Sequence, residues 1–288
     1  MIKKENLYKI GIGTWKIDYE HFENDIDALV YSHNKGENYL SLYMLYNNGE
    51  VVKQMRKFLD KIDREKVFIN VNLEPTIKEI EDIEKQLDEY LKILDIKYVD
   101  NLQIHGSFVS EIPLVEVYKE IKRLVDIGKV RYIGISNVNL EQLKEISSLV
   151  RIDFFEGVYN LECKLYEDIG VLNYCKENDI KFICYQPLRR NRTARRNYPL
   201  LVELALKYNK TQNQIILNWI INRKNIMPLI KSTNIKRIDE NNESINFKMS
   251  DDDYNKLDNF RNTEFDNVKI DWDCNGGVTI DQLANQFE

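Results

Sequence analysis

Side chains that can bind or transform a small molecule recur at one kind of position in this sequence, the end of a predicted strand. They offer hydroxyl, amide, carboxyl, phenol, imidazole and amino groups, together with one indole ring. These residues are Thr14, Trp15, Ser41, Tyr46, Asn72, His105, Ser136, Asn137, Glu156, Tyr185, Lys231 and Ser232. In a closed parallel barrel the loops that follow the strands meet at one end, so these groups would share a single site. The pattern predicts one functional face assembled from many separate segments.

Metal chemistry has little support in the composition. The chain has three histidines, at positions 21, 33 and 105, and four cysteines that lie far apart without a CxxC pair. Neither a zinc cage nor a dense disulfide framework is indicated, and we expect no metal site. Cys184 precedes Tyr185 on a predicted strand, so we expect it to be a core thiol.

Eight short apolar segments, rich in Val, Ile, Tyr and Phe, are the predicted strands that must position these groups. They cover residues 9–13, 39–42, 67–71, 98–104, 132–136, 154–158, 181–185 and 226–230. The segments between them carry apolar residues three and four apart, which is typical of helices with one buried face. Eight strand–helix units predict an α/β fold of the (β/α)₈ TIM barrel type. The alternative, a doubly wound open sheet, would normally carry a third glycine in the turn that reads GIGTW at 11–15.

Length, charge and hydropathy agree with this fold. The chain of 288 residues suits two domains or one barrel. Counting eight units favours a single barrel domain over residues 1–261, with a C-terminal tail, 262–288, packing on or near it.

The formal net charge of −6 gives no reason to expect nucleic-acid or anionic-membrane binding. The sequence shows neither an export leader nor a long uncharged apolar stretch, so we expect a cytoplasmic protein.

Six segments of the chain, taken together, resemble the aldo/keto reductase family in order and spacing. They read GIGTWK, YLSLYMLYNNGE, YVDNLQIH, GKVRYIGISN, CYQPL and IKSTNIKRIDENN. The resemblance spans residues 7–260, which is nearly the whole predicted barrel. It implies an oxidoreductase that transfers a hydride between NADP(H) and a carbonyl group.

The resemblance also implies a catalytic set of four residues, of which this chain keeps two. Tyr46 and His105 fall on the family's catalytic tyrosine and histidine, whereas Ser41 replaces its aspartate and Asn72 replaces its lysine. A phenol with a pKa near 10 is a poor acid–base catalyst without a cation, which at about 4 Å is worth about 4 kcal/mol. We therefore expect weak tuning of Tyr46. Losing both charges together leaves no unpaired charge, so the barrel should stay stable.

The cofactor residues implied by the resemblance are better preserved. They are Thr14, Ser136, Asn137, Glu156, Tyr185, Lys231, Ser232, Thr233, Arg237, Glu240 and Asn241. Lys231 and Arg237 would bind the adenosine 2′-phosphate and so favour NADP over NAD. Glu156 stands where the family has a glutamine for the nicotinamide carboxamide, and an ionised carboxylate cannot donate a hydrogen bond. Trp15 is expected to contact the substrate.

The role of a basic segment after the seventh predicted strand is left open. Five arginines occur there, at positions 189, 190, 192, 195 and 196. They would clamp a cofactor phosphate or bind an anionic substrate in one interpretation. In the other they form a solvated basic loop.

Three functions are consistent with these residues. The preferred one is an NADPH-dependent oxidoreductase with an altered active site, acting on a carbonyl, imine or conjugated alkene of a small molecule. The second is a catalytically inactive NADP(H)-binding pseudo-enzyme that regulates or scaffolds a protein partner. The third is a non-redox, dehydratase-like activity on the same barrel.

Overall fold

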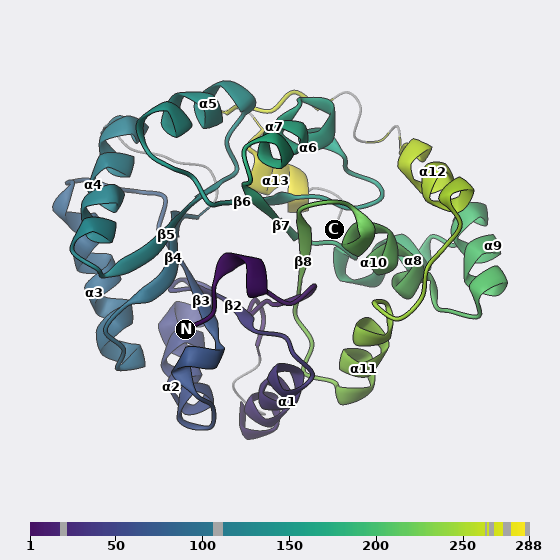
Figure 1. Ribbon diagram of the computed structural model, residues 1–288, viewed down its shortest axis with the longest axis horizontal. Coiled ribbons are helices and arrows are strands. Elements are labelled where there is room, and N and C mark those ends of the chain that lie inside the picture. The colour runs from purple at the N-terminus through teal and green to yellow at the C-terminus, as the bar shows by residue number, and fades with distance from the viewer. Residues whose placement is uncertain (18–21, 106–111, 263, 265–267, 273–277, 286–288) are drawn as a thin grey trace.

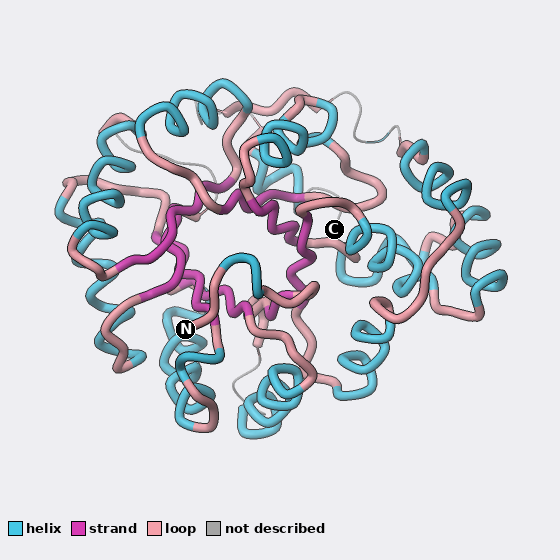
Figure 2. The backbone as a smooth tube through the Cα atoms, viewed as in Figure 1, coloured by secondary structure: helices cyan, strands magenta, loops and turns pink. Residues whose placement is uncertain are grey.

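A computed structural model describes the chain except residues 18–21, 106–111, 263, 265–267, 273–277 and 286–288. Its centre is a closed barrel in which the strands follow one another in sequence order and are all parallel, the magenta ring of Figure 2. The strands are β1 (Gly11–Ile12), β2 (Tyr39–Tyr43), β3 (Phe68–Leu73), β4 (Val99–Ile104), β5 (Val130–Ser136), β6 (Phe154–Val158), β7 (Lys181–Tyr185) and β8 (Ile226–Ile230). The prediction of a (β/α)₈ barrel is confirmed.

Helices surround this ring (Figure 1). They are α1 (Phe22–Asn34), α2 (Glu50–Asp60), α3 (Glu81–Leu94), α4 (Leu114–Asp126), α5 (Leu140–Leu149), α6 (Leu165–Asp168), α7 (Val171–Glu177), α8 (Arg192–Arg195), α9 (Pro199–Tyr208), α10 (Gln212–Asn222), α11 (Ile235–Glu243), α12 (Asp251–Asn259) and α13 (Ile280–Asn285). The apolar spacing explains why they pack inward, since α2 buries Val52, Met55 and Phe58 against the barrel. Hydrogen bonds between Thr211 and Gln214 cap the start of α10 in both directions.

The strand boundaries differ from the predicted ones mainly at the first strand. Residues 9–13 were expected to be extended, but pairing with β2 and β8 involves only Gly11 and Ile12. The three predicted strands at 154–158, 181–185 and 226–230 match β6, β7 and β8. The boundaries of a strand depend on its neighbours, which the apolar pattern of one segment does not contain.

An aromatic layer closes the amino end of the barrel. Tyr39 stacks on Phe68 with 5.4 Å between ring centroids, and Phe154 lies 5.2 Å from Phe68. Ile2 and Leu7 of the N-terminal segment pack against this layer from outside. In Figure 1 that segment, in dark purple, crosses the barrel end that faces the viewer. Ligands therefore have to enter from the opposite end, where the strands terminate.

Above the aromatic layer the barrel interior is polar. Asn70, Asn101 and Gln103 are buried, and Asn101 donates to the Oδ1 atom of Asn70 over 2.6 Å. Gly134 makes room for these amides, because a Cβ atom there would lie 2.5 Å from both Asn101 Nδ2 and Gln103 Oε1. Because these side chains are amides and not aliphatic groups, the floor of the site above them is polar and hydrogen-bonded.

The described part of the C-terminal segment packs onto the main core. Ile280 and Leu283 of α13 are buried. Trp272 lies 6.1 Å from the ring of Tyr166 and packs against the same core. These contacts accord with the predicted tail on the barrel, whose boundary at residue 262 stays a prediction.

A buried carboxyl group makes the stability of this fold depend on pH. Glu37 accepts hydrogen bonds from Ser32 Oγ at 2.6 Å and Asn242 Nδ2 at 2.7 Å. Burial raises the pKa of Glu37 from 4.5 to about 7, although these two bonds act in the opposite direction. Between these pH values the folded state holds more protons than the unfolded state, so the free energy of unfolding falls as the pH rises.

We expect Glu37→Gln to remove up to about 3 kcal/mol of that fall. The measurement is urea unfolding of both proteins at pH 5 and pH 7. An identical pH dependence in the two proteins would show that Glu37 does not titrate in this range.

Candidate active site

Tyr46 and His105 lie together at the carboxyl end of the barrel, with Tyr43 between them. The ring centroids of Tyr46 and His105 are 6.3 Å apart and their planes are nearly perpendicular. The ring centroid of Tyr43 lies 3.9 Å from that of His105 and 5.2 Å from that of Tyr46. Two phenols and an imidazole therefore form one cluster, so Tyr43 belongs to the site as well as Tyr46.

A tight turn after β2 positions Tyr46. Asn47 and Asn48 both have positive φ angles, at 53° and 52°, and Gly49 follows with a φ of 84° before α2 begins. Asparagine tolerates this left-handed conformation better than most residues, and glycine adopts it freely. The Asn-Asn-Gly sequence therefore turns the chain sharply and leaves Tyr46 at the rim of the barrel.

Ser41 and Asn72, expected at the family's aspartate and lysine positions, are hydrogen-bonded to each other. Asn72 Nδ2 donates to Ser41 Oγ over 3.1 Å and to the carbonyl of Leu42 over 3.0 Å. Both side chains are buried, with 6% of Ser41 and 2% of Asn72 exposed. The two residues thus form a neutral pair, and their place in the lining of the pocket stays a prediction.

Interior amides connect this neutral pair to Glu156 on β6. Gln103 Nε2 donates to Asn72 Oδ1 at 2.6 Å and to Glu156 Oε2 at 2.8 Å. Asn70 Nδ2 donates to Ser41 Oγ at 3.1 Å. We did not predict Asn70, Asn101 or Gln103 as site residues. The alternation of Asn70 with Asn72, and of Asn101 with Gln103, was the available signal, since residues two apart share a strand face.

Ser136 and Asn137 end β5 next to Tyr185 of β7. Ser136 Oγ donates to the carbonyl of Ile104 at 2.7 Å, so its lone pairs remain the groups that face a ligand. Asn137 Oδ1 accepts from Tyr185 at 3.1 Å and from Tyr166 at 3.2 Å. These bonds fix the orientation of the Tyr185 ring. The structure places Ser136, Asn137 and Tyr185 near one another, and it adds Tyr166, which was not predicted as a site residue.

The predicted phosphate-binding residues surround the start of α11. Lys231, Ser232 and Thr233 are partly exposed, and Arg237 is exposed in the first turn of the helix. Asn234 caps that turn by accepting from the backbone N–H of Arg237 at 3.1 Å. A helix start with two basic side chains suits a phosphate group.

The two adenine-side residues are less accessible. Glu240 accepts from Thr211 Oγ1 at 2.6 Å, and Asn241 is buried with 8% exposed. Contact of either residue with a nucleotide therefore stays a prediction.

A buried carboxylate that was not predicted as a site residue, Glu162, anchors the arginine segment, residues 189–196. Glu162 Oε2 accepts from Arg189 Nη1 at 2.5 Å and from Thr193 Oγ1 at 2.6 Å. Glu162 Oε1 accepts from Tyr198 at 2.6 Å and lies 3.2 Å from Arg196 Nε. Burial raises the pKa of Glu162, but the hydrogen bonds outweigh this and hold it below its ordinary value. Arg189 is buried, so the segment is not simply a solvated basic loop.

Trp15 and Thr14, which follow β1, contact the loop after β7 and strand β2. The guanidinium of Arg190 lies 3.9 Å from the centre of the Trp15 ring, a cation–π contact. Thr14 is buried and donates to the carbonyl of Ser41 at 2.7 Å. Arg190 therefore holds the loop after β7 against the loop after β1.

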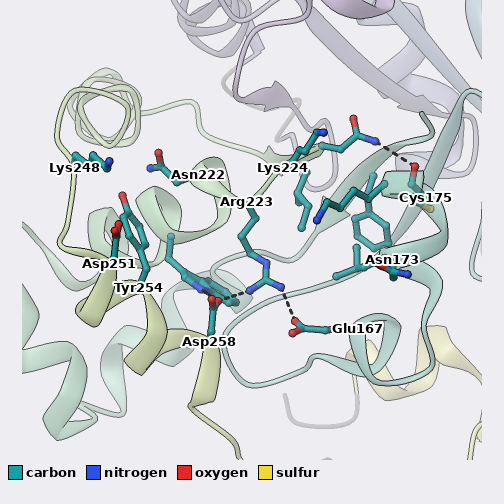
Figure 3. A pocket seen from close by; sticks show the side chains of 16 residues that line it. Glu167, Asn173, Cys175, Asn222, Arg223, Lys224, Lys248, Asp251, Tyr254 and Asp258 are labelled. Atoms are coloured by element: carbon teal, nitrogen blue, oxygen red, sulfur yellow. Dashed lines mark hydrogen bonds and ion pairs between the residues drawn. The ribbon is translucent and has the colours of Figure 1, made fainter. Parts of the chain in front are cut away.

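A cavity of about 640 Å³ lies elsewhere, on the outer wall near the start of β8 (Figure 3). Arg223 crosses it and pairs with Asp258 and, at 3.0 Å, with Glu167. The charge of Arg223 is thus matched by two carboxylates within the protein. We place the candidate site at the barrel end instead, because the phenol, imidazole and basic groups converge there.

The described residues offer neither a metal site nor a membrane-spanning helix. These residues contain no group of three or more His, Cys, Asp or Glu side chains arranged to hold a metal ion. None of their helices is long and apolar enough to cross a membrane. Cys163, Cys175 and Cys184 are buried free thiols, as expected for Cys184.

The fold and this site define a (β/α)₈ barrel with a tyrosine–histidine cluster and a basic helix start at one end. The model of the aldo/keto reductase family matches residues 9–262, and the chain belongs to this family. The expected family membership is therefore confirmed. Its members are NADP-dependent oxidoreductases of carbonyl compounds.

Individual relatives are distant in sequence and close in fold. Aldo-keto reductase family 1 member C18 of Rattus norvegicus is 27% identical over 284 residues, covering 87% of each chain. A thermostable aldo-keto reductase solved with the inhibitor epalrestat is 29% identical, with a TM-score of 0.82 over 88% of this chain and 95% of that one. An enzyme of Klebsiella pneumoniae solved with NADP and acetate is 19% identical, with a TM-score of 0.78 over 88% and 90%.

Proposed function

We propose that this protein is an NADP(H)-dependent oxidoreductase with an altered active site, acting on a carbonyl, imine or conjugated alkene of a small molecule. The observation that carries the proposal is the cluster of Tyr46, Tyr43 and His105 at the same barrel end as the neutral Ser41–Asn72 pair. The proton donors Tyr46 and His105 are retained, while the family's charged aspartate–lysine pair is replaced by neutral residues. A cytoplasmic location remains part of this proposal.

The residues present fit a phosphate-bearing nicotinamide nucleotide. Arg237 and Lys231 at the start of α11 would hold the 2′-phosphate, which favours NADP(H) over NAD(H). Ser136 would accept from the carboxamide, and Tyr185, held by Asn137, would lie against the nicotinamide ring. When bound, the cofactor supplies the hydride. Lys231 before α11 and Arg237 in its first turn would also allow an acidic chain to bind a polyanion.

The proton chemistry belongs to this chain's own residues. The Tyr46 hydroxyl and the His105 imidazole are the groups that donate a proton to the substrate heteroatom. Where the family has lysine, Asn72 offers an uncharged amide, which favours the phenolate form of Tyr46 far less than an ammonium group would. The substrate class should therefore need little acid catalysis, as holds for a protonated imine, an activated carbonyl or a conjugated alkene.

The same neutral pair favours a second candidate, an NADP(H)-binding pseudo-enzyme that acts on a protein partner. In that case cofactor binding persists without turnover. Such a protein would also retain its cellular role after Tyr46→Phe.

Turnover measurements separate the two candidates. We expect NADPH oxidation with at least one imine, activated carbonyl or enone. Its rate should fall in Tyr46→Phe, but by less than the roughly 10²-fold that a general acid typically supplies, because such substrates need little acid catalysis. Tyr254→Phe is the matched control, since Tyr254 donates to Asn218 and lines the separate cavity on the outer wall. Cofactor binding without turnover across the whole panel would favour the pseudo-enzyme, and absence of NADP(H) binding would refute both.

A further inference from the structure

A carboxylate lies among amide side chains inside the barrel. Glu156, on β6, is 5% exposed. Its Oε2 atom accepts from Gln103 Nε2 at 2.8 Å and from Asn70 Nδ2 at 3.4 Å. Amide N–H groups aimed at a carboxylate oxygen favour its negatively charged form. A charge on Glu156 would act in the interior, where charge interactions are stronger than at the surface.

Glu156 is adjacent to the residues assigned to the nicotinamide. It pairs in register with Ser136 on β5, and its own carbonyl accepts from the backbone N–H of Asn137 at 3.1 Å. Through Gln103 it is one hydrogen-bonded step from Asn72, at the position of the missing lysine. The carboxylate thus belongs to the layer directly beneath the site of hydride transfer.

The charge of this layer differs from that of the family pattern. An aspartate, a lysine and a glutamine sum to zero, whereas Ser41, Asn72 and Glu156 sum to −1. The nicotinamide ring carries a positive charge in NADP⁺ and none in NADPH. We propose that Glu156 favours the oxidised cofactor electrostatically, so that this chain binds NADP⁺ more tightly relative to NADPH; this rests on the proposed function.

The same preference acts on the reaction. In the proposed reaction a bound NADPH would supply a hydride, with its electron pair, to the substrate carbon, and Tyr46 or water would supply the proton to the substrate heteroatom. A charged Glu156 would attract the resulting positive nicotinamide ring more strongly than the neutral one. Each tenfold preference for NADP⁺ lowers the two-electron reduction potential of the bound cofactor by about 30 mV. Bound NADPH is thereby a stronger hydride donor, which offsets the weak acid catalysis of the neutral Ser41–Asn72 pair.

Calorimetric titration of NADP⁺ and of NADPH into three proteins tests this inference without relying on turnover. Glu156→Gln removes the charge, keeps the shape and restores the family's residue. Asp153→Asn is the matched control, because it removes a buried carboxylate from the residue that directly precedes β6, three residues before Glu156. We expect the ratio of the NADPH to the NADP⁺ dissociation constant to fall about tenfold in Glu156→Gln and to stay unchanged in Asp153→Asn.

The possible outcomes are distinct. An unchanged ratio in folded Glu156→Gln overturns the role of Glu156 and leaves the proposed function standing. If that variant does not fold, the wild-type ratio decides: tighter binding of NADP⁺ supports the inference and tighter binding of NADPH overturns it. Failure of the wild-type protein to bind either form overturns the proposed function and this inference with it.

Discussion

Replacing Ser41 by aspartate and Asn72 by lysine in the same chain is expected to raise kcat/KM for an ordinary aldehyde by about 10²-fold. Their direct hydrogen bond shows that the two positions are in contact, so the new side chains can form an ion pair in place of the neutral one. The lysine would favour the phenolate form of Tyr46 and bring its pKa closer to neutrality. The measurement is steady-state NADPH oxidation with the aldehyde as the varied substrate.

The single substitution Asn72→Lys is the informative control. It places a cation in a buried position without its aspartate, which typically costs about 3–5 kcal/mol of stability. Urea unfolding should show that loss in the single variant and its recovery in the double variant. A folded double variant that is no faster than the wild-type protein would show that Tyr46 is not the acid, and would shift attention to Tyr43 or His105.

Glu162→Ala is expected to lower the free energy of unfolding by about 3–5 kcal/mol, because it leaves Arg189 buried without the carboxylate that neutralises it. Thr193 and Tyr198 lose an acceptor at the same time. Since the arginine segment is anchored through these contacts, we also expect weaker NADP(H) binding. Denaturant unfolding and cofactor titration measure the two effects separately.

Glu264→Ala provides the matched control for that experiment. Glu264 also pairs with Arg196, at 2.9 Å, but its side chain is 47% exposed. An exposed ion pair contributes about 1 kcal/mol or less, so this variant should resemble the wild-type protein. Equal losses in the two variants would mean that burial of Glu162 is not what stabilises the segment.

The sequence predicted the elements of the fold better than the contacts between them. Residues 154–158 were correctly bounded because the Phe-Phe-Glu-Gly-Val segment is short, apolar and flanked by polar residues. The resemblance assigned the catalytic tyrosine to Tyr46 alone, whereas the structure places Tyr43 as well as Tyr46 against His105. The alternation within β3 and β4 was visible, but only barrel closure shows that those amides meet inside.

Glu162 could not have been found from the sequence. It lies in a loop without periodicity, and its partners Arg189 and Asn262 are 27 and 100 residues away along the chain. A buried carboxylate of this kind is defined by tertiary packing alone. The same holds for Glu37, whose partner Asn242 is 205 residues away.

The Arg190–Trp15 contact turns one of the three tryptophans into an optical reporter. Trp15 is partly exposed at the barrel end, whereas Trp219 is 1% exposed. Any displacement of the guanidinium from the Trp15 indole would change the polarity around the ring and hence its emission wavelength. Fluorescence of a Trp219→Phe, Trp272→Phe protein would therefore report on this single contact during a cofactor titration, with no added label.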